Sequence, residues 1–190
     1  MNSIRTERPN QYKWLFNPFL YIAGAKALLI GWIAMLLASV VAYFSKTHFD
    51  GAIDIHFGAG GNYSFFLAEQ FIAWISLSML FYPIGLIFSK SKIRLIDVAG
   101  TMAMARVITL PVSFMGFLPI YPVNLDDPTI LILSIIVTLV PAIWMIALMF
   151  NAFVVSTNIR GAKATACFIT GLISAEILSK VLLHYLIPYL

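Results

Sequence analysis

Three side chains that could do chemistry interrupt the last apolar stretch of the chain. Glu176, Lys180 and His184 follow one another at four-residue intervals within an otherwise apolar run, residues 164–187. On a helix this spacing places all three on one face, and Glu before Lys is the favourable direction for an ion pair. Ionisable groups inside a membrane span are expensive, so they are expected either to clamp helices together or to carry protons or ions.

Two further charged residues lie at matching depths in other apolar stretches. Arg106 lies as deep in its stretch as Glu176 does in its own, within about 5 Å at about 1.5 Å per helical residue. Glu69 lies near the level of Lys180. We therefore predict that Glu176 neutralises Arg106 and Lys180 together, in an intramembrane charge cluster that includes Glu69 and His184. A structural clamp is the first interpretation, and a proton- or ion-coupled site is the alternative.

A second group of polar side chains lies in the longest link between apolar stretches. The segment "HFDGAIDIH" contains two imidazoles and two carboxylates, His48, Asp50, Asp54 and His56. Such groups could bind a divalent ion such as zinc, although their spacing matches no established metal-binding motif. We interpret the segment as a solvated loop with a metal site as the alternative, and we expect no cofactor.

The composition indicates the environment in which these residues lie. Of the 190 residues, 61% are hydrophobic and 11% are charged, whereas a soluble domain is about half apolar and about a quarter charged. Each of five apolar stretches is long enough to cross the hydrocarbon, which takes about 20 helical residues. They cover residues 25–44, 65–88, 98–118, 129–150 and 164–187. We predict an all-α bundle of five transmembrane helices over residues 25–190, preceded by a cytoplasmic juxtamembrane segment, residues 1–24.

The basic residues predict the orientation of this bundle. Most of the 12 Lys and Arg residues precede or open the first stretch, or lie in the second and fourth links. The positive-inside rule therefore places the N-terminus in the cytoplasm and the C-terminus outside, and we expect a bacterial cytoplasmic (inner) membrane. The alternative for the first stretch, a cleaved signal peptide, is disfavoured because the apolar run exceeds the usual length of about 7–15 residues.

Small residues and prolines mark special positions within the stretches. Helices associate in a bilayer through close packing over small side chains. We predict packing faces at Gly31, Gly171, Ala175 and Ser179. Proline removes a helical hydrogen bond, which predicts kinks at Pro83, Pro111 and Pro141. Asn17 before Pro18, and Asp127 before Pro128, are typical of helix starts.

No motif of a catalytic site is present. The sequence contains no HExxH, GxSxG, Walker or GxGxxG motif, and no nucleophile and base converge, so we predict that the protein is not an enzyme. The net charge of +4 is small and gives no reason to expect nucleic acid. The expected partners are the lipid bilayer and either another membrane protein or a second copy of the chain.

Three stretches carry a resemblance to a known family. They are "LIDVAGTMAMARVITLPVSF", "IWMIALMFNAFVVSTNIRGAKA" and "ACFITGLISAEILSK". With five spans and the predicted orientation, the chain resembles the Yip (Ypt/Rab-interacting protein) domain family, and its short N-terminal segment is similar to the bacterial members. The resemblance implies a membrane-organising or partner-binding protein of the scaffold or trafficking type. A small transporter or channel built around the charge cluster is the alternative.

Overall fold

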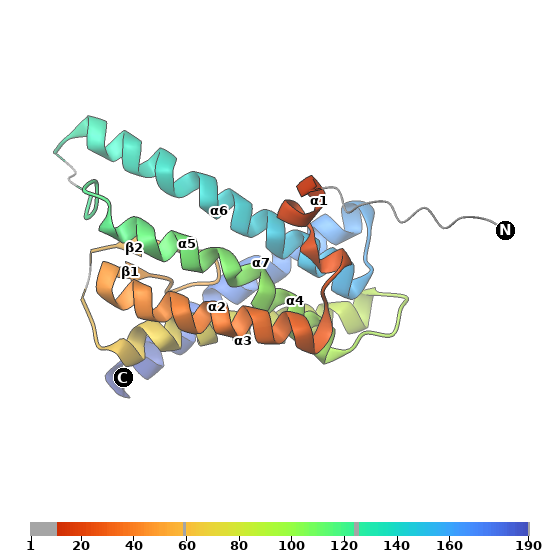
Figure 1. Cartoon of the computed structure of the whole chain (residues 1–190). Coiled ribbons are helices and arrows are strands. Elements are labelled where there is room, and N and C mark those ends of the chain that lie inside the picture. Colours follow the sequence, from red (N-terminus) through yellow and green to blue (C-terminus); the bar gives the residue numbers. More distant parts are fainter. Residues whose placement is uncertain (1–10, 59, 124–125, 190) are drawn as a thin grey trace.

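The chain folds into an elongated helical bundle (Figure 1). The computed structural model describes residues 11–58, 60–123 and 126–189. Within these ranges, five helical segments are long and apolar enough to cross a membrane: α2 (Gly24–Ser45), α3 (Tyr63–Phe88), Leu95–Phe117, α6 (Pro128–Thr157) and α7 (Gly161–Leu186). The five predicted helices are thereby confirmed, and they suggest an integral membrane protein. Residues 1–10 of the predicted juxtamembrane segment lie outside the described residues.

The third span is broken near its middle rather than being one regular helix. It consists of α4 (Leu95–Ala105), a 3-10 turn η2 (Arg106–Ile108), α5 (Thr109–Ser113) and a second 3-10 turn η3 (Phe114–Phe117). Pro111 lies in this broken part, and its backbone nitrogen carries no hydrogen to donate to a helical hydrogen bond. The break begins at Arg106, so the one arginine inside a span projects from an irregular turn. Pro83 and Pro141 lie inside α3 and α6, which both continue through them.

Close backbone contacts hold α4 at the centre of the bundle. α4 packs against α2, α3 and α6, and α7 packs mainly against α3. A Cβ on Gly31 of α2 would overlap the backbone of Ala103 in α4. A Cβ on Gly171 of α7 would overlap the ring of Phe81 in α3. Ala175 and Ser179 of α7 are fully buried, so all four predicted packing positions lie inside the bundle.

The first half of α6 stands apart from the other helices (Figure 1). Ser134 is the one buried residue between Pro128 and Trp144, a range that the structure describes completely. Asp127 caps this helix, since its Oδ1 accepts hydrogen bonds from the backbone of Thr129 and Ile130, as predicted. The analogous prediction for Asn17 is wrong, because Pro18 opens only a 3-10 turn, η1 (Pro18–Leu20), and the Asn17 side chain does not cap it.

The remaining elements are short. α1 (Gln11–Phe16) lies against the second half of α6, where Trp144 Nε1 and Asn151 Nδ2 donate to the carbonyl oxygens of Leu15 and Phe16. The link between α2 and α3 contains β1 (Thr47–His48) and β2 (His56–Phe57), which pair antiparallel. A 3-10 turn, η4 (Ile187–Tyr189), follows α7. The β1–β2 link and the last turns of α7 lie at the same end of the bundle (Figure 1).

Candidate functional site

The link between α2 and α3 is folded into the end of the bundle, which corrects the interpretation of a solvated loop. We name residues 46–58 the inserted loop. Its buried residues are Thr47, His48, Phe49, Gly51 and Ala52. Burial of Phe49 and Ala52 draws the loop inwards through the hydrophobic effect. The backbone groups that are carried in with these side chains then need hydrogen-bond partners.

Two carboxylates provide partners for backbone N–H groups of the inserted loop. Glu69 Oε2 accepts a hydrogen bond from Phe49 N at 3.1 Å, and Glu69 Oε1 lies 2.8 Å from His48 Nδ1. Glu176 Oε2 accepts a hydrogen bond from Ile53 N at 3.0 Å. Glu69 comes from α3 and Glu176 from α7, so the two helices hold the loop from different sides.

Arg106 binds the same loop through its carbonyl groups. Its Nη1 donates to the Ala52 carbonyl oxygen at 3.1 Å, and its Nη2 donates to Gln70 Oε1 at 3.2 Å. The Arg106 side chain is the largest among the fully buried ones that the structure describes. A buried guanidinium is costly unless it is paired and hydrogen-bonded, and here most of its bonds are directed to the loop and to α3.

One peptide group joins Arg106 to Glu176. The Ala52 carbonyl that accepts from Arg106 and the Ile53 N–H that donates to Glu176 belong to the same peptide bond. Among the described residues Arg106 makes no ion pair within 4.0 Å. Glu176 was predicted to neutralise Arg106 together with Lys180; in the structure the Arg106 and Glu176 side chains are joined by one bridging peptide group rather than by an ion pair. Hydrogen bonds in such a chain polarise and strengthen one another.

Lys180 lies at the outer rim of this arrangement. Its Nζ donates to Asp54 Oδ2 in the inserted loop and lies 3.5 Å from Glu176 Oε1. The Glu176–Lys180 part of the predicted cluster is thus present. Glu69, which was expected near Lys180, is instead engaged by His48. His184 lies one turn farther along α7 and is exposed beside the Tyr185 ring, whereas the preceding residue, Leu183, is buried.

The polar residues of the inserted loop form a second group beside Lys180. His56 Nδ1 lies 3.5 Å from Asp50 Oδ1, and the His48 and His56 rings stack with their centroids 4.9 Å apart. Of the four candidate metal ligands, the structure brings Asp50, Asp54 and His56 together, with one ligand atom of each within 4.8 Å of the others. The charge cluster and the metal candidates are therefore neighbouring parts of one site.

The Asp50–His56 pair is sensitive to pH. The imidazole of His56 lowers the pKa of the Asp50 carboxyl below its ordinary value of 3.8, and the Asp50 carboxylate raises the pKa of His56 above 6.5. The Asp50 contribution is present above pH 3.8 and is lost as the pH falls through its lowered pKa. The His56 contribution is present below pH 6.5 and is lost as the pH rises through its raised pKa. Both contribute fully between those two values.

Sequence reasoning missed Gly51 and Gln70 as parts of this site. Gly51 lies directly against the Glu176 carboxylate, so a Cβ at this position would overlap its oxygens. The "DG" dipeptide was the available signal, but it is also common in solvated turns. Gln70 gave no separate signal because it follows Glu69 on a helix that is apolar overall.

Replacing Gly51 with Ala should destabilise the protein by about 1–3 kcal/mol, the usual cost of inserting a methyl group into a packed site. The added Cβ must displace the Glu176 carboxylate from Ile53 N. Gly60→Ala is the matched control, since a Cβ there would meet nothing within 4 Å. Denaturant unfolding of the purified protein in detergent would measure both. Equal stability of the two variants would contradict the described packing of Gly51.

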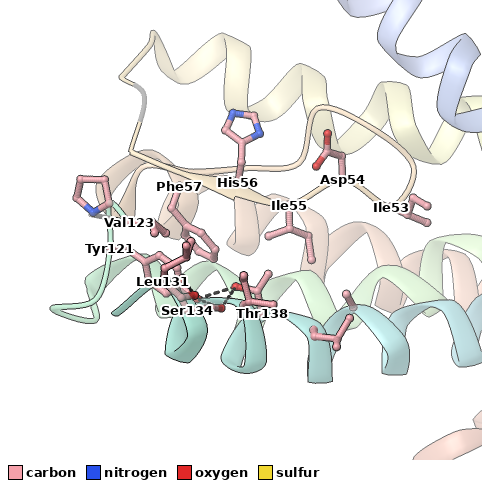
Figure 2. A pocket seen from close by; sticks show the side chains of 14 residues that line it. Ile53, Asp54, Ile55, His56, Phe57, Tyr121, Val123, Leu131, Ser134 and Thr138 are labelled. Atoms are coloured by element: carbon pink, nitrogen blue, oxygen red, sulfur yellow. Dashed lines mark hydrogen bonds between the residues drawn. The ribbon is translucent and has the colours of Figure 1, made fainter. Parts of the chain in front are cut away.

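The opposite face of the inserted loop lines a groove along α6. Figure 2 shows Ile55 and Phe57 directed towards α6, while Asp54 and His56 point to the other side of the loop. The groove has a volume of about 610 Å³ and is mainly apolar. At its floor, Tyr121 Oη donates to the Ser134 carbonyl oxygen and lies 2.6 Å from Thr138 Oγ1. The alternation along "IDIHF" therefore separates a polar face from an apolar one.

Comparison of the chain with protein-family models, with curated proteins and with solved structures found no match.

Proposed function

We propose that the chain is an integral membrane protein, with its N-terminus in the cytoplasm of a bacterium, that organises or binds membrane partners and does not act as an enzyme. The observation that carries the proposal is how the buried Glu69 and Arg106 and the half-buried Glu176 are used. Glu69, Arg106 and Glu176 each hydrogen-bond to the backbone of the inserted loop. A transport site needs charged groups that exchange partners with a solute, whereas these three are engaged by backbone groups.

The surface of the first half of α6 supports the same class of function. Its aliphatic side chains are exposed over several turns, including Ile132, Ile136 and Val140. In a bilayer such a face contacts either lipid or another membrane protein, and only packing, not the hydrophobic effect, distinguishes the two. The resemblance of other parts of the chain to short bacterial members of the Yip family is in keeping with a scaffold or trafficking role for the protein.

Photo-crosslinking in native membranes tests the proposal. A photoreactive residue at Ile136 of α6 should give a discrete protein adduct that mass spectrometry can identify. Ile173 of α7 is the matched control, because the two isoleucines are equally exposed, at 55% and 56%. We expect mainly lipid adducts from the control. Lipid adducts alone from both positions would contradict a partner-binding role for α6.

A small transporter or channel is the second candidate, and one observation favours it. Arg106 Nε and Gln70 Nε2 are buried and have no hydrogen-bond partner among the described residues, so donors lie available inside the bundle. Proton or ion flux into proteoliposomes would test this function, with Glu176→Gln as the variant expected to abolish it. A flux that depends on Glu176 would replace the scaffold proposal.

The proposed orientation makes a separate prediction. After replacement of Cys167 by Ser, a cysteine at Ser91 should react with an impermeant thiol reagent only from the cytoplasmic side. A cysteine at Asn62 should react only from outside. Both positions are exposed in the structure, so burial would not explain a failure to react. Labelling of the Ser91 position from outside would rule out this orientation.

A further inference from the structure

The inserted loop places metal-binding side chains symmetrically about its turn. The pattern is His48-x-Asp50 before the turn and Asp54-x-His56 after it. The β1–β2 ladder pairs His48 directly with His56, which brings the two halves of the pattern together. Buried contacts fix the backbone between them, because Glu176 and Arg106 bind the peptide group that joins Ala52 to Ile53. The ligand-bearing segment is thus held in place before any ion binds.

Two atoms that can act as metal ligands face each other in this segment. His56 Nδ1 and Asp50 Oδ1 lie 3.5 Å apart. Oδ1 of Asp50 is shielded from solvent and accepts no hydrogen bond of good geometry from the described residues. At this separation either the proton of a His56 Nδ1–H group or a metal ion can lie between the two atoms. Two ligands about 2.0–2.2 Å from a tetrahedral ion lie about 3.4 Å apart, close to the separation found here.

Asp54 completes a three-ligand set. Its ligand oxygen lies within 4.8 Å of those of Asp50 and His56, so a small side-chain movement would bring all three to one ion. Lys180 donates to Asp54 Oδ2, and a carboxylate offers a second oxygen that can bind an ion. Ligating carboxylates are commonly oriented by such outer hydrogen bonds. The His48 ring stacks on the His56 ring, and its Nδ1 is hydrogen-bonded to Glu69 Oε1.

We propose that Asp50, Asp54 and His56 bind one divalent transition-metal ion at the outer face of the inserted loop. An imidazole with two carboxylates suits Zn²⁺ or Mn²⁺, while Ca²⁺ and Mg²⁺ prefer sites built from oxygen alone. Three protein ligands leave the remaining coordination positions to water. The site lies beside Glu69, Arg106 and Glu176, which bind the buried side of the inserted loop, and Asp54 also binds Lys180. The ion therefore stabilises the exposed side of the same loop.

The test uses the full chain in detergent, purified through a tag without histidines, in a Cys167→Ser background that removes the thiol. After treatment with a chelator, the protein is dialysed against Zn²⁺ and bound metal is measured by mass spectrometry. We expect one equivalent per chain. His56→Gln and Asp50→Asn should each weaken binding by at least about 10-fold, the minimum effect typical even of outer-shell residues. His184→Gln, an exposed histidine outside the site, should bind as the parent does.

A second measurement guards against variants that do not fold. Co²⁺ added to the parent protein should give visible absorption bands distinct from those of aqueous Co²⁺, and Zn²⁺ should displace them. Circular dichroism and gel filtration would establish that each variant retains the fold. The proposal is overturned if the parent binds less than one equivalent and leaves the Co²⁺ spectrum unchanged. It is also overturned if folded His56→Gln binds as tightly as the parent, since a proton would then be the cation beside Asp50.

Discussion

Replacing Arg106 with Met should lower the free energy of unfolding by about 3–5 kcal/mol, the cost typical of removing one partner from a buried charged group. Two effects add. The Ala52 carbonyl and Gln70 Oε1 lose their donor, and a buried group left without a partner costs about 1–3 kcal/mol. The carboxylates of Glu69 and Glu176 also lose the positive charge with which both interact. Denaturant unfolding in detergent, followed by tryptophan fluorescence, would measure the change.

Two further variants separate charge from hydrogen bonding at this position. Arg106→Lys keeps the charge but can reach only one of the two acceptors, so its loss of stability should be intermediate. Arg160→Met removes an exposed arginine from the link between α6 and α7 and should leave the unfolding midpoint unchanged. If Arg106→Met unfolds at the same midpoint as the parent, Arg106 does not hold the inserted loop.

Arg106 and Glu176 should be energetically coupled although they do not form a direct ion pair. Glu176→Gln removes the negative charge at Ile53 N. The loss destabilises mainly Arg106, because Lys180, with its side chain 46% exposed, can be hydrated instead. We expect a loss of about 3 kcal/mol, the lower end for buried groups, since the Glu176 side chain is 19% exposed. The double variant with Arg106→Met should cost about 1–2 kcal/mol less than the sum of the single changes.

A second cycle provides the matched control for this coupling. Glu69 is also a glutamate that binds the backbone of the inserted loop, so it can be compared with Glu176. It binds His48 and Phe49 N rather than the Ala52–Ile53 peptide. The coupling of Glu69→Gln with Arg106→Met should therefore be the weaker of the two. Additive costs in the Glu176 cycle would mean that the shared peptide does not transmit the interaction.

The helices were predictable from the sequence because long apolar runs and loop polarity suffice to locate them. The cap at Asp127 followed from residue type alone. The similar depth of Arg106 and Glu176 was also predictable, since helical rise converts residue number into depth. The peptide group of the inserted loop that lies between the two side chains could not be predicted. Depth along a helix carries no information about a loop from elsewhere in the chain that enters the bundle at the same depth.

The inserted loop was misjudged because its polar residues dominated the interpretation. Two histidines and two aspartates suggest solvent, yet Phe49, Ile55 and Phe57 are spaced to give the segment an apolar face. Alternation over so few residues is a weak signal, and two-residue strands lie below what periodicity can identify. His184 shares the four-residue spacing of Glu176 and Lys180 but is exposed, because this spacing places residues on one face of a helix without giving each of them a partner there. Pro111 predicted a kink in the third span, but the start of the break at Arg106 could not be predicted, since 3-10 turns share the composition of the helices they interrupt.

The bridging peptide also has a consequence for the order in which the chain is synthesised. The first partners of the Arg106 guanidinium, Ala52 and Gln70, both precede it in the sequence. Glu176 is made last, with the final helix. Once the third span has left the ribosome, both acceptors of the guanidinium among the described residues have therefore already been synthesised. The nascent chain can therefore bury and hydrogen-bond Arg106 before α7 is made. When α7 packs, Glu176 binds an inserted loop that is already in place.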